Sequence, residues 1–186
     1  LFLVDTVSSF GAEEFSATTA NVAIVVGSAN KCLHGVPGVS FLLVHKDAWA
    51  QAERFSPRSM YLDLKRYRAY ANSMAQTPFT PPVQALMALN QAIIELEQDG
   101  GPAARKMSYG ALNAQLRTGL ADLGLRTRFD AATASASVII AELPKGRTFA
   151  EFYNAMRNRG FLVYDVKGAM HDECFLISNM GALDSS

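Results

Sequence analysis

The sequence predicts an α/β fold in which a sheet of buried strands is followed by helices and then by a small α+β unit. Three observations indicate this order. Apolar runs of strand length lie near the start of the chain, at residues 1–5, 21–28 and 39–46. Two helical patterns occupy residues 83–123. Strand-like and helix-like segments then follow in a βαββ order over residues 136–178.

The composition of the 186-residue chain is that of a globular protein with a hydrophobic core. This length is enough for one large domain or two small ones. Hydrophobic residues make up 49% of the chain and charged residues 18%, a balance that argues against a disordered chain. The 17 basic and 17 acidic residues cancel, and there is no long basic run. We therefore expect no nucleic-acid partner.

The two cysteines and the hydropathy pattern favour a cytoplasmic protein. Cys32 and Cys174 are too far apart in sequence for a CxxC metal site or a disulfide framework, and so favour a reducing compartment. No apolar stretch reaches the ~18 residues that a membrane-spanning helix needs, so we expect no membrane partner. The chain begins LFLVD, without Met, in what reads as the middle of a buried strand. We therefore expect an N-terminal part to be missing from it.

The first three strands are expected in the runs LFLVD (1–5), NVAIVVGS (21–28) and VSFLLVHK (39–46). Continuous apolar runs of this kind are typical of strands that are buried on both faces of a sheet. A short connection joins the second run to the third, so these strands are expected to be neighbours. The pattern does not require all of them to be parallel.

The middle of the chain is expected to be helical on both sides of an irregular stretch. Residues 47–55 form a candidate short helix, and residues 56–82 are expected to be irregular because prolines interrupt them. An apolar stripe at helical spacing then predicts a helix that other structure covers. This stripe consists of Val83, Leu86, Met87, Ile93 and Ile94, and it is widened by Ala85, Leu89, Ala92 and Leu96.

The C-terminal part is expected to alternate between helix and strand. Gly100 and Gly101 end the first long helix, and a second is expected from Pro102 to Leu123, with Gly124 as its stop. The segments that follow are a strand at 136–143, a helix at 148–160 and strands at 161–166 and 174–178.

Two residues at strand ends, Asp5 and Lys31, are the candidates for chemistry. If the first two strands run in the same direction, both residues reach the carboxyl edge of the sheet, where open α/β sheets bind ligands. Simpler interpretations stay open at this point. Asp5 is also a candidate cap that accepts hydrogen bonds from the amides of Ser8 or Ser9, and Lys31 is also a candidate solvated loop lysine.

The surroundings of Lys31, in SANKCLHGVPG (28–38), favour a reactive lysine. Apolar neighbours and a Gly/Pro turn predict a partly desolvated side chain, which loses its proton more readily and attacks carbonyls. Pyridoxal phosphate needs such a lysine for its Schiff base and a carboxylate that keeps its ring nitrogen protonated. Asp5 and Lys31 are the right pair for this cofactor, and Val7 is then expected against the face of its ring.

Other kinds of site have little support in the sequence. His34, His45 and His171 lack the spacing of a metal site, so we expect no metal. There is no hydrolase GxSxG elbow, no P-loop and no GxGxxG motif.

Five segments, spread in order along nearly the whole chain, carry a family resemblance. They are VDTVSSFG (4–11), SANKCLHGVPG (28–38), MYLDLKRY (60–67), PFTPP (78–82) and ELEQDGGPAAR (95–105). Together they resemble the 2-aminoethylphosphonate–pyruvate aminotransferases, a group of class V aminotransferases with the type I pyridoxal-phosphate fold. The resemblance implies that the chain is the C-terminal half of such an enzyme. Residues 1–100 would complete the large cofactor-binding domain, with part of a mostly parallel sheet, and residues 101–186 would form a linking helix and a small C-terminal α+β domain.

The resemblance implies a role for each matching residue. Lys31 would form the Schiff base and move the proton between the substrate carbon and the cofactor, and Asp5 would pair with the pyridine nitrogen. Ser28 and Asn30 would lie near the cofactor phosphate. Thr80 would reach the phosphate of the neighbouring subunit's cofactor, so the enzyme would be a homodimer with a shared active site.

The implied reaction is amino transfer from 2-aminoethylphosphonate to pyruvate, as in phosphonate catabolism. One departure concerns the substrate: where the family has an arginine that holds the anionic group, this chain has Leu176, within CFLISNMG (174–181). Asp165 adds a further negative charge in a turn that differs from the family's, and Arg66, Arg68 and Lys167 are candidate substitutes for the lost arginine. Leucine offers no donor, whereas an arginine fork on an anion is a strong polar contact.

Three hypotheses therefore stay open. The first is an aminotransferase that acts on a small aminophosphonate. The second is a class V pyridoxal-phosphate enzyme with an altered amino donor, and the third is a partial homologue without catalysis.

Overall fold

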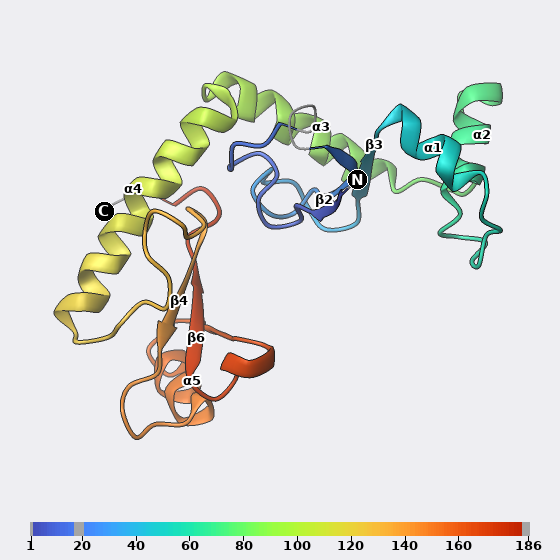
Figure 1. The fold of residues 1–186 in the computed structure, drawn as a ribbon. Helices are drawn as coiled ribbons and strands as arrows, with labels where there is room; N and C mark the ends of the chain where they lie inside the picture. The colour runs from blue at the N-terminus through green and yellow to red at the C-terminus, as the bar shows by residue number, and fades with distance from the viewer. Residues whose placement is uncertain (1, 17–20, 184–186) are drawn as a thin grey trace.

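The computed structural model describes residues 2–16 and 21–183, and it contains two three-stranded sheets connected by two long helices. Figure 1 shows the first sheet below α3 and the second sheet beside α4. This arrangement confirms the predicted α/β class. The elements are β1 (Phe2–Asp5), β2 (Val22–Ser28), β3 (Ser40–Val44), α1 (Lys46–Ala52), α2 (Leu64–Met74), α3 (Val83–Gln98), α4 (Gly101–Asp122), β4 (Val138–Glu142), α5 (Phe149–Arg157), β5 (Tyr164–Asp165), the 3-10 turn η1 (Gly168–Met170) and β6 (Cys174–Ser178).

The first sheet has the order β1-β2-β3, so the three predicted strands are neighbours, with β2 between the other two. β1 pairs with β2 in parallel, with Asp5 opposite Val26. β3 pairs with β2 in the antiparallel direction, because the short connection between them reverses the chain. Among the described residues of the first sheet, then, one strand pair is parallel and the other is antiparallel.

Burial on both faces, predicted for all three runs, holds best for the central strand. Val22 and Val25 of β2 are buried, whereas Leu3 of β1 and Leu43 of β3 are exposed by 69% and 51%. The reason is position, because β2 has a neighbour on each side and the other two strands are edges. The outer strands are apolar without being covered by the described part of the chain.

A close contact fixes β3 against β2 near the end that carries the candidate site. Gly27 faces the ring of Phe41, and a Cβ at Gly27 would lie 2.3 Å from a ring carbon. Phe10 packs edge-on against the same ring, with 4.9 Å between the centroids. The absence of a side chain at Gly27 thus allows the aromatic pair to hold the segment after β1 on the sheet.

The region between the first sheet and the long helices contains one helix that the sequence pattern did not indicate. The short helix expected at 47–55 is confirmed as α1. The expectation that residues 56–82 are irregular is wrong, because α2 occupies their centre. Asp63 starts α2 by accepting a hydrogen bond from the amide of Lys65 at 3.1 Å. The prolines lie outside this helix and do not interrupt it.

The start of α3 is confirmed at Val83, but the prediction that its apolar stripe is covered is wrong for this chain. Val83 and Met87, both in the stripe, are exposed by 50% and 69%, and the other three members are exposed as well. The buried residues of α3 are Ala85, Ala92 and Leu96, three of the four residues that were expected to widen the stripe. Small side chains make these contacts because α3 packs closely, as at Gly38, where a Cβ would lie 3.3 Å from that of Ala85.

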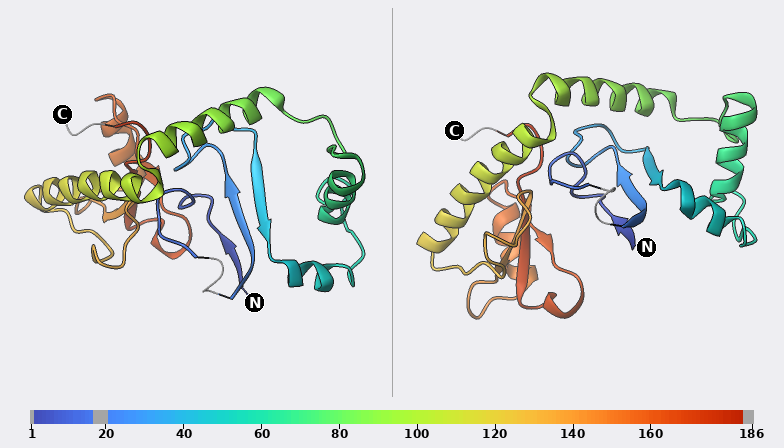
Figure 2. Two further views of the ribbon diagram at one scale, coloured as in Figure 1. Left: turned by 90° about the horizontal axis from the view of Figure 1, so that it is seen from above. Right: turned by 45° about the horizontal axis from the view of Figure 1, so that its top comes forward.

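The second sheet has the order β4-β6-β5, and both of its pairs are antiparallel. Figure 2 shows it with α5, apart from the first sheet. A buried cluster lies between this sheet and the C-terminal half of α4, and it includes Leu120, Ile139 and Phe175. The βαββ order is confirmed, although the strand expected at 161–166 is reduced to β5. The expected domain boundary at residue 100 stays a prediction.

α5 begins with a capping box, in which Thr148 and Glu151 each bond the other's backbone. α4 is the longest helix of the described residues and starts at Gly101, one residue before the predicted Pro102. Over the part of the chain that the structure describes, no helix has both the length and the apolar character to cross a membrane.

The contact between Gly27 and Phe41 gives a stability prediction. Gly27→Ala is expected to lower the free energy of unfolding by about 1–3 kcal/mol, because the added methyl group overlaps the Phe41 ring. Gly119→Ala, on α4, is the matched control: apart from its chain neighbours and the nearby backbone of its own helix, no atom of the described residues lies within 4 Å of the new methyl group, so the change should stabilise the helix by up to about 1 kcal/mol. Urea unfolding of both variants measures this difference, and equal effects would contradict it.

Candidate functional site

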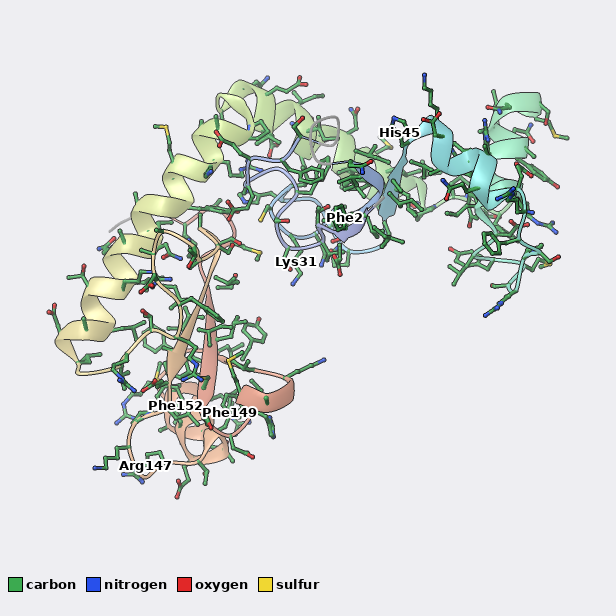
Figure 3. The ribbon with its side chains drawn as sticks, viewed as in Figure 1. Phe2, Lys31, His45, Arg147, Phe149 and Phe152 are labelled. Atoms are coloured by element: carbon green, nitrogen blue, oxygen red, sulfur yellow. The ribbon has the colours of Figure 1, made fainter. Side chains whose placement is uncertain are left out.

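The structure brings Asp5 and Lys31 to the same edge of the first sheet, as predicted. Asp5 is the last residue of β1, and Lys31 lies in the turn that follows β2. Because β1 and β2 are parallel, their carboxyl ends meet at one edge. Figure 3 shows the Lys31 side chain projecting outward from the ribbon of its turn.

The Asp5 carboxylate is only partly used by the chain itself. Its Oδ1 accepts a hydrogen bond from the amide of Val7 at 2.8 Å. The capping role is therefore confirmed, but with Val7 as the donor in place of the expected Ser8 or Ser9. Among residues 2–16 and 21–183, no group donates to Oδ2. The exposed carboxylate can thus accept a further hydrogen bond from a ligand.

The Lys31 ammonium is exposed, which differs from the partly desolvated lysine that was expected. No side chain in the described part of the chain forms a hydrogen bond or ion pair with it. The backbone beneath it is rigid: the amide of His34 donates to the Lys31 carbonyl at 2.9 Å, and the amide of Gly35 donates to that of Ala29 at 2.8 Å. Gly35 approaches so closely that a Cβ there would lie 2.9 Å from the Ala29 oxygen. The expectation of a rigid turn is confirmed.

The side chain of Cys32, next to the lysine, holds the turn against the segment that follows β1. Its side chain is 1% exposed, and its thiol donates to the carbonyl of Ser8 at 3.2 Å. Its own carbonyl accepts a hydrogen bond of 2.7 Å from the guanidinium of Arg105, a buried residue of α4. Burial raises the pKa of the Cys32 thiol. A neutral, hydrogen-bonded thiol in this place is structural rather than nucleophilic.

The other residues predicted to bind the cofactor differ in how far they are buried. Val7 is half-buried and follows Thr6, whose amide and hydroxyl both donate to the carbonyl of Val26 at 2.8 Å. Ser28 is half-buried, and its Oγ is buried without a hydrogen-bond partner among the described residues. Asn30 is exposed. Val7, Ser28 and Asn30 thus belong to the same edge as Asp5 and Lys31, since they lie at or just beyond the ends of β1 and β2.

Thr80 is exposed in the segment between α2 and α3, which Figure 2 shows beyond β3, on the side of the first sheet away from β1. It belongs to neither of the strand ends that carry the other predicted residues.

A partly buried polar network joins the lysine turn to the second sheet, and the sequence pattern did not indicate it. Glu13 accepts hydrogen bonds from the hydroxyl of Ser135 at 3.0 Å and the amide of Ala136 at 2.8 Å. The hydroxyl of Ser137 donates to the Ser8 carbonyl at 3.3 Å, the same oxygen that the Cys32 thiol contacts. Because these partners lie more than a hundred residues apart in sequence, no local pattern indicates the pairing. Arg105 also contacts the lysine turn, through the carbonyl of Cys32. One sign of this contact is present in the sequence, a charged residue directly after the small residues GGPAA.

On the second sheet, Leu176 is half-buried in β6, opposite Ile140 on one side and Tyr164 on the other. Asp165, expected to add negative charge, is instead paired with His171, with 2.6 Å between Oδ2 and Nδ1. This hydrogen bond and the carboxylate charge raise the pKa of His171. A protonated His171 therefore offsets the charge of Asp165.

The basic residues considered as substitutes for an arginine at position 176 differ in their surroundings. Lys167 is exposed and comes just before η1, close in sequence to β5. Arg68 lies over the ring of Trp49, 4.7 Å from its centroid, and so is engaged far from β6. Arg66 is exposed on α2. Of the three, only Lys167 lies next to a strand of the second sheet, between β5 and η1.

Within the described residues, no group of three His, Cys, Asp or Glu side chains is placed to hold a metal ion.

The sequence matches one family model, described as aminotransferase class-V, over residues 1–160. A 2-aminoethylphosphonate–pyruvate transaminase from Polaromonas sp. is 37% identical over 97% of this chain. The alignment covers 48% of that relative, so the chain spans about half the length of the curated relatives it matches.

Solved structures show the same fold. An alanine–glyoxylate aminotransferase from Nostoc sp. superposes with a TM-score of 0.89 at 22% identity, over 97% of this chain and 48% of that one. A pyridoxamine–pyruvate aminotransferase from Mesorhizobium loti superposes with a TM-score of 0.82 at 28% identity, over 96% and 46%. The C-terminal half of a type I pyridoxal-phosphate fold, expected from the sequence, agrees with these neighbours.

The ion pair on the second sheet gives a pH prediction. Because Asp165 raises the pKa of His171, the stability that the pair contributes is present below the ordinary histidine pKa and is lost as pH rises through the raised one. Asp165→Asn is expected to return the His171 pKa toward about 6.5. A pH titration of the His171 ring by NMR measures the shift, with His45 as the internal control. An unchanged His171 pKa in the variant would contradict the assignment.

Proposed function

Because this chain belongs to the class V aminotransferase family, we propose that it carries the lysine half of a pyridoxal-phosphate-dependent transaminase, with 2-aminoethylphosphonate and pyruvate as substrates. One observation carries the proposal: Asp5 and Lys31 lie at the ends of adjacent parallel strands, each with an unused polar group. In this proposal, residues 1–100 belong to the cofactor-binding domain and residues 101–186 to the linking helix and small domain.

The donor set of the described edge fits pyridoxal phosphate, the cofactor of this family. The exposed Lys31 amine has no partner in the described chain, Asp5 has an unoccupied oxygen, and the buried Ser28 hydroxyl lacks a hydrogen bond. An orphaned buried hydroxyl is costly unless another group satisfies it. When bound, the cofactor supplies a carbonyl that condenses with amines and a ring that withdraws electrons.

Each of these residues then has its own role in binding the cofactor or in moving a proton. Lys31 holds the cofactor through Nζ and, once released, moves a proton to and from the substrate carbon as general acid and base. The Asp5 carboxylate accepts the hydrogen bond of the ring N–H and keeps that nitrogen protonated. Val7 covers one face of the ring, and Ser28 and Asn30 donate to the phosphate. The rigid backbone between Ala29 and Gly35 limits the positions that Nζ reaches.

The proposed enzyme is a homodimer in which Thr80 donates to the phosphate in the neighbouring subunit's site. The distance of the Thr80 segment from β1 in one chain supports this arrangement. A second support is an apolar surface on the α1–α2 connection, in which Phe55, Met60, Tyr61 and Leu62 are all exposed by more than 60%. Exposed apolar residues gathered in this way are typical of a surface that another polypeptide covers.

A second candidate function has its own observation. Leu176 places an apolar, half-buried side chain where the family resemblance implies an arginine, and its neighbours on the adjacent strands are Ile140 and Tyr164. This environment favours an amino donor without an anionic group at that point. Pyridoxal phosphate, Lys31 and Asp5 keep the same roles in this second function.

The covalent role of Lys31 can be tested directly in a full-length protein that carries this chain. Borohydride reduction of the loaded protein is expected to attach the cofactor to the peptide that contains Lys31, with loss of the visible absorbance band. Lys31→Ala should show neither the band nor the adduct. Lys46→Ala, an exposed lysine at the start of α1, is the matched control and should retain both.

A visible band that survives Lys31→Ala would refute the cofactor assignment. A wild-type protein that binds no pyridoxal phosphate would support the non-catalytic homologue instead.

The substrate is tested by Leu176→Arg. If Leu176 occupies the anion position, the new guanidinium should lower the KM for 2-aminoethylphosphonate at least tenfold, because a charge-assisted fork forms only there. Leu123→Arg, at an exposed position after α4, is the control and should leave the KM unchanged. Steady-state kinetics with pyruvate held constant measure both. An unchanged KM in the Leu176 variant would show that β6 does not contact the anionic group.

A further inference from the structure

We propose that His34 is a positioning residue for Lys31, and that it ties the lysine turn to the end of β6 through the hydroxyl group of Tyr109. The inference rests on the proposed function of Lys31 and concerns a different residue. His34 was considered above only as a metal ligand, a role that the described chain does not support.

The backbone of His34 holds the lysine from the C-terminal side of the turn. Its amide donates to the carbonyl of Lys31 at 2.9 Å, closing a tight turn around Cys32 and Leu33. His34 itself has a φ of 65°, in the left-handed region that residues other than glycine seldom adopt. A conformation of this kind persists only when surrounding contacts hold it. The ring of His34 adds a side-chain contact to the backbone hydrogen bonds of the turn.

The ring of His34 is held by one buried hydroxyl. Its Nε2 lies 2.5 Å from the Oη of Tyr109, which is on α4 and is 2% exposed. The same Oη accepts the amide of Gly181, just beyond β6, at 3.1 Å. No second acceptor for the Tyr109 proton is found in residues 2–16 and 21–183. The hydroxyl therefore donates to Nε2, and His34 is neutral with its proton on Nδ1.

The charges near His34 maintain this neutral state at physiological pH. Burial, and next the Arg105 guanidinium, lower the pKa of His34, against the opposing effect of two carboxylates. As the pH falls through this lowered pKa, the protonated ring directs an N–H at an oxygen that already accepts one. The Tyr109 proton then loses its acceptor. The charged groups that act on the ring are Arg105 on α4 and Glu95 and Asp99 at the end of α3, and the titratable group in contact with it is the Tyr109 hydroxyl.

The two hydrogen bonds on Tyr109 connect the parts of the site that bind different groups. Gly181 ends the segment Cys174–Gly181, to which the proposed function assigns contact with the amino donor. Lys31 is the residue that moves the proton. A displacement at the end of β6 therefore reaches the Lys31 carbonyl through Tyr109 and His34, without any contact between the substrate and either residue.

The test compares three variants of the full-length holoenzyme with a matched control. His34→Ala removes the acceptor and is expected to lower kcat about tenfold, the equivalent of one buried hydrogen bond. His34→Gln retains a group that bonds the Tyr109 hydroxyl but does not titrate, so kcat should recover to within about twofold. The decline of kcat on the acid side should also shift in this variant. Tyr109→Phe should behave as His34→Ala.

His45→Gln is the control, because His45 caps α1 and lies away from Lys31, as Figure 3 shows. It should leave both kcat and the pH profile unchanged. Nitrogen-15 NMR of the wild-type histidines gives a readout that needs no activity. His34 is expected as the Nδ1–H tautomer at neutral pH, titrating below about 6.5, and Tyr109→Phe should abolish the tautomer preference.

A proton on Nε2 at neutral pH would overturn the proposal, as would a His34→Ala variant with wild-type kcat and acid limb. The proposed function fails separately, if Lys31→Ala keeps the covalent cofactor. Borohydride trapping in His34→Ala should still attach the cofactor to Lys31, since the variant changes the position of the lysine and not its chemistry.

Discussion

The parallel pairing of β1 with β2 is the constraint on which the candidate site depends. It places the Asp5 carboxylate and the turn that carries Lys31 at one edge of a sheet, although they belong to different strands. The pairing is held in register at that edge by Thr6, whose amide and hydroxyl both bond the carbonyl of Val26. A slip by one residue would move every side chain of β1 to the opposite face and separate the pair.

The turn that carries Lys31 is stabilised by groups that take no part in the proposed chemistry. The Ser8 carbonyl accepts from Cys32 of the turn and from Ser137 next to β4, so one oxygen joins the turn to the second sheet. Arg105 and Tyr109 add contacts from successive turns of α4. Buried polar groups of this kind are satisfied only in one arrangement, and they specify it for that reason. The backbone that carries the exposed Lys31 amine is therefore rigid, and this limits the positions that its nitrogen can reach.

The exposed apolar surfaces have a different meaning from the buried network. The stripe of α3 and the outer strands of the first sheet have the composition of core elements, yet they are open to solvent in this chain. The chain spans about half the length of the relatives that it matches. An apolar pattern indicates that a segment is suited to burial. Which polypeptide segment covers it depends on the rest of the protein assembly.

The sequence by itself determined the class of fold and the ends of most elements, and it predicted that Asp5 and Lys31 lie together at one edge of the sheet. These properties are local: apolar runs define strands, glycines end helices, and a residue after a strand lies at its edge. It did not determine α2, which depends on the Asp63 cap rather than on apolar spacing, nor which face of α3 is buried. Only the tertiary structure decided the contacts of Glu13, His34, Arg105 and Tyr109. Their partners are distant in the chain, and a hydrogen bond between distant residues leaves no periodic signal in the sequence.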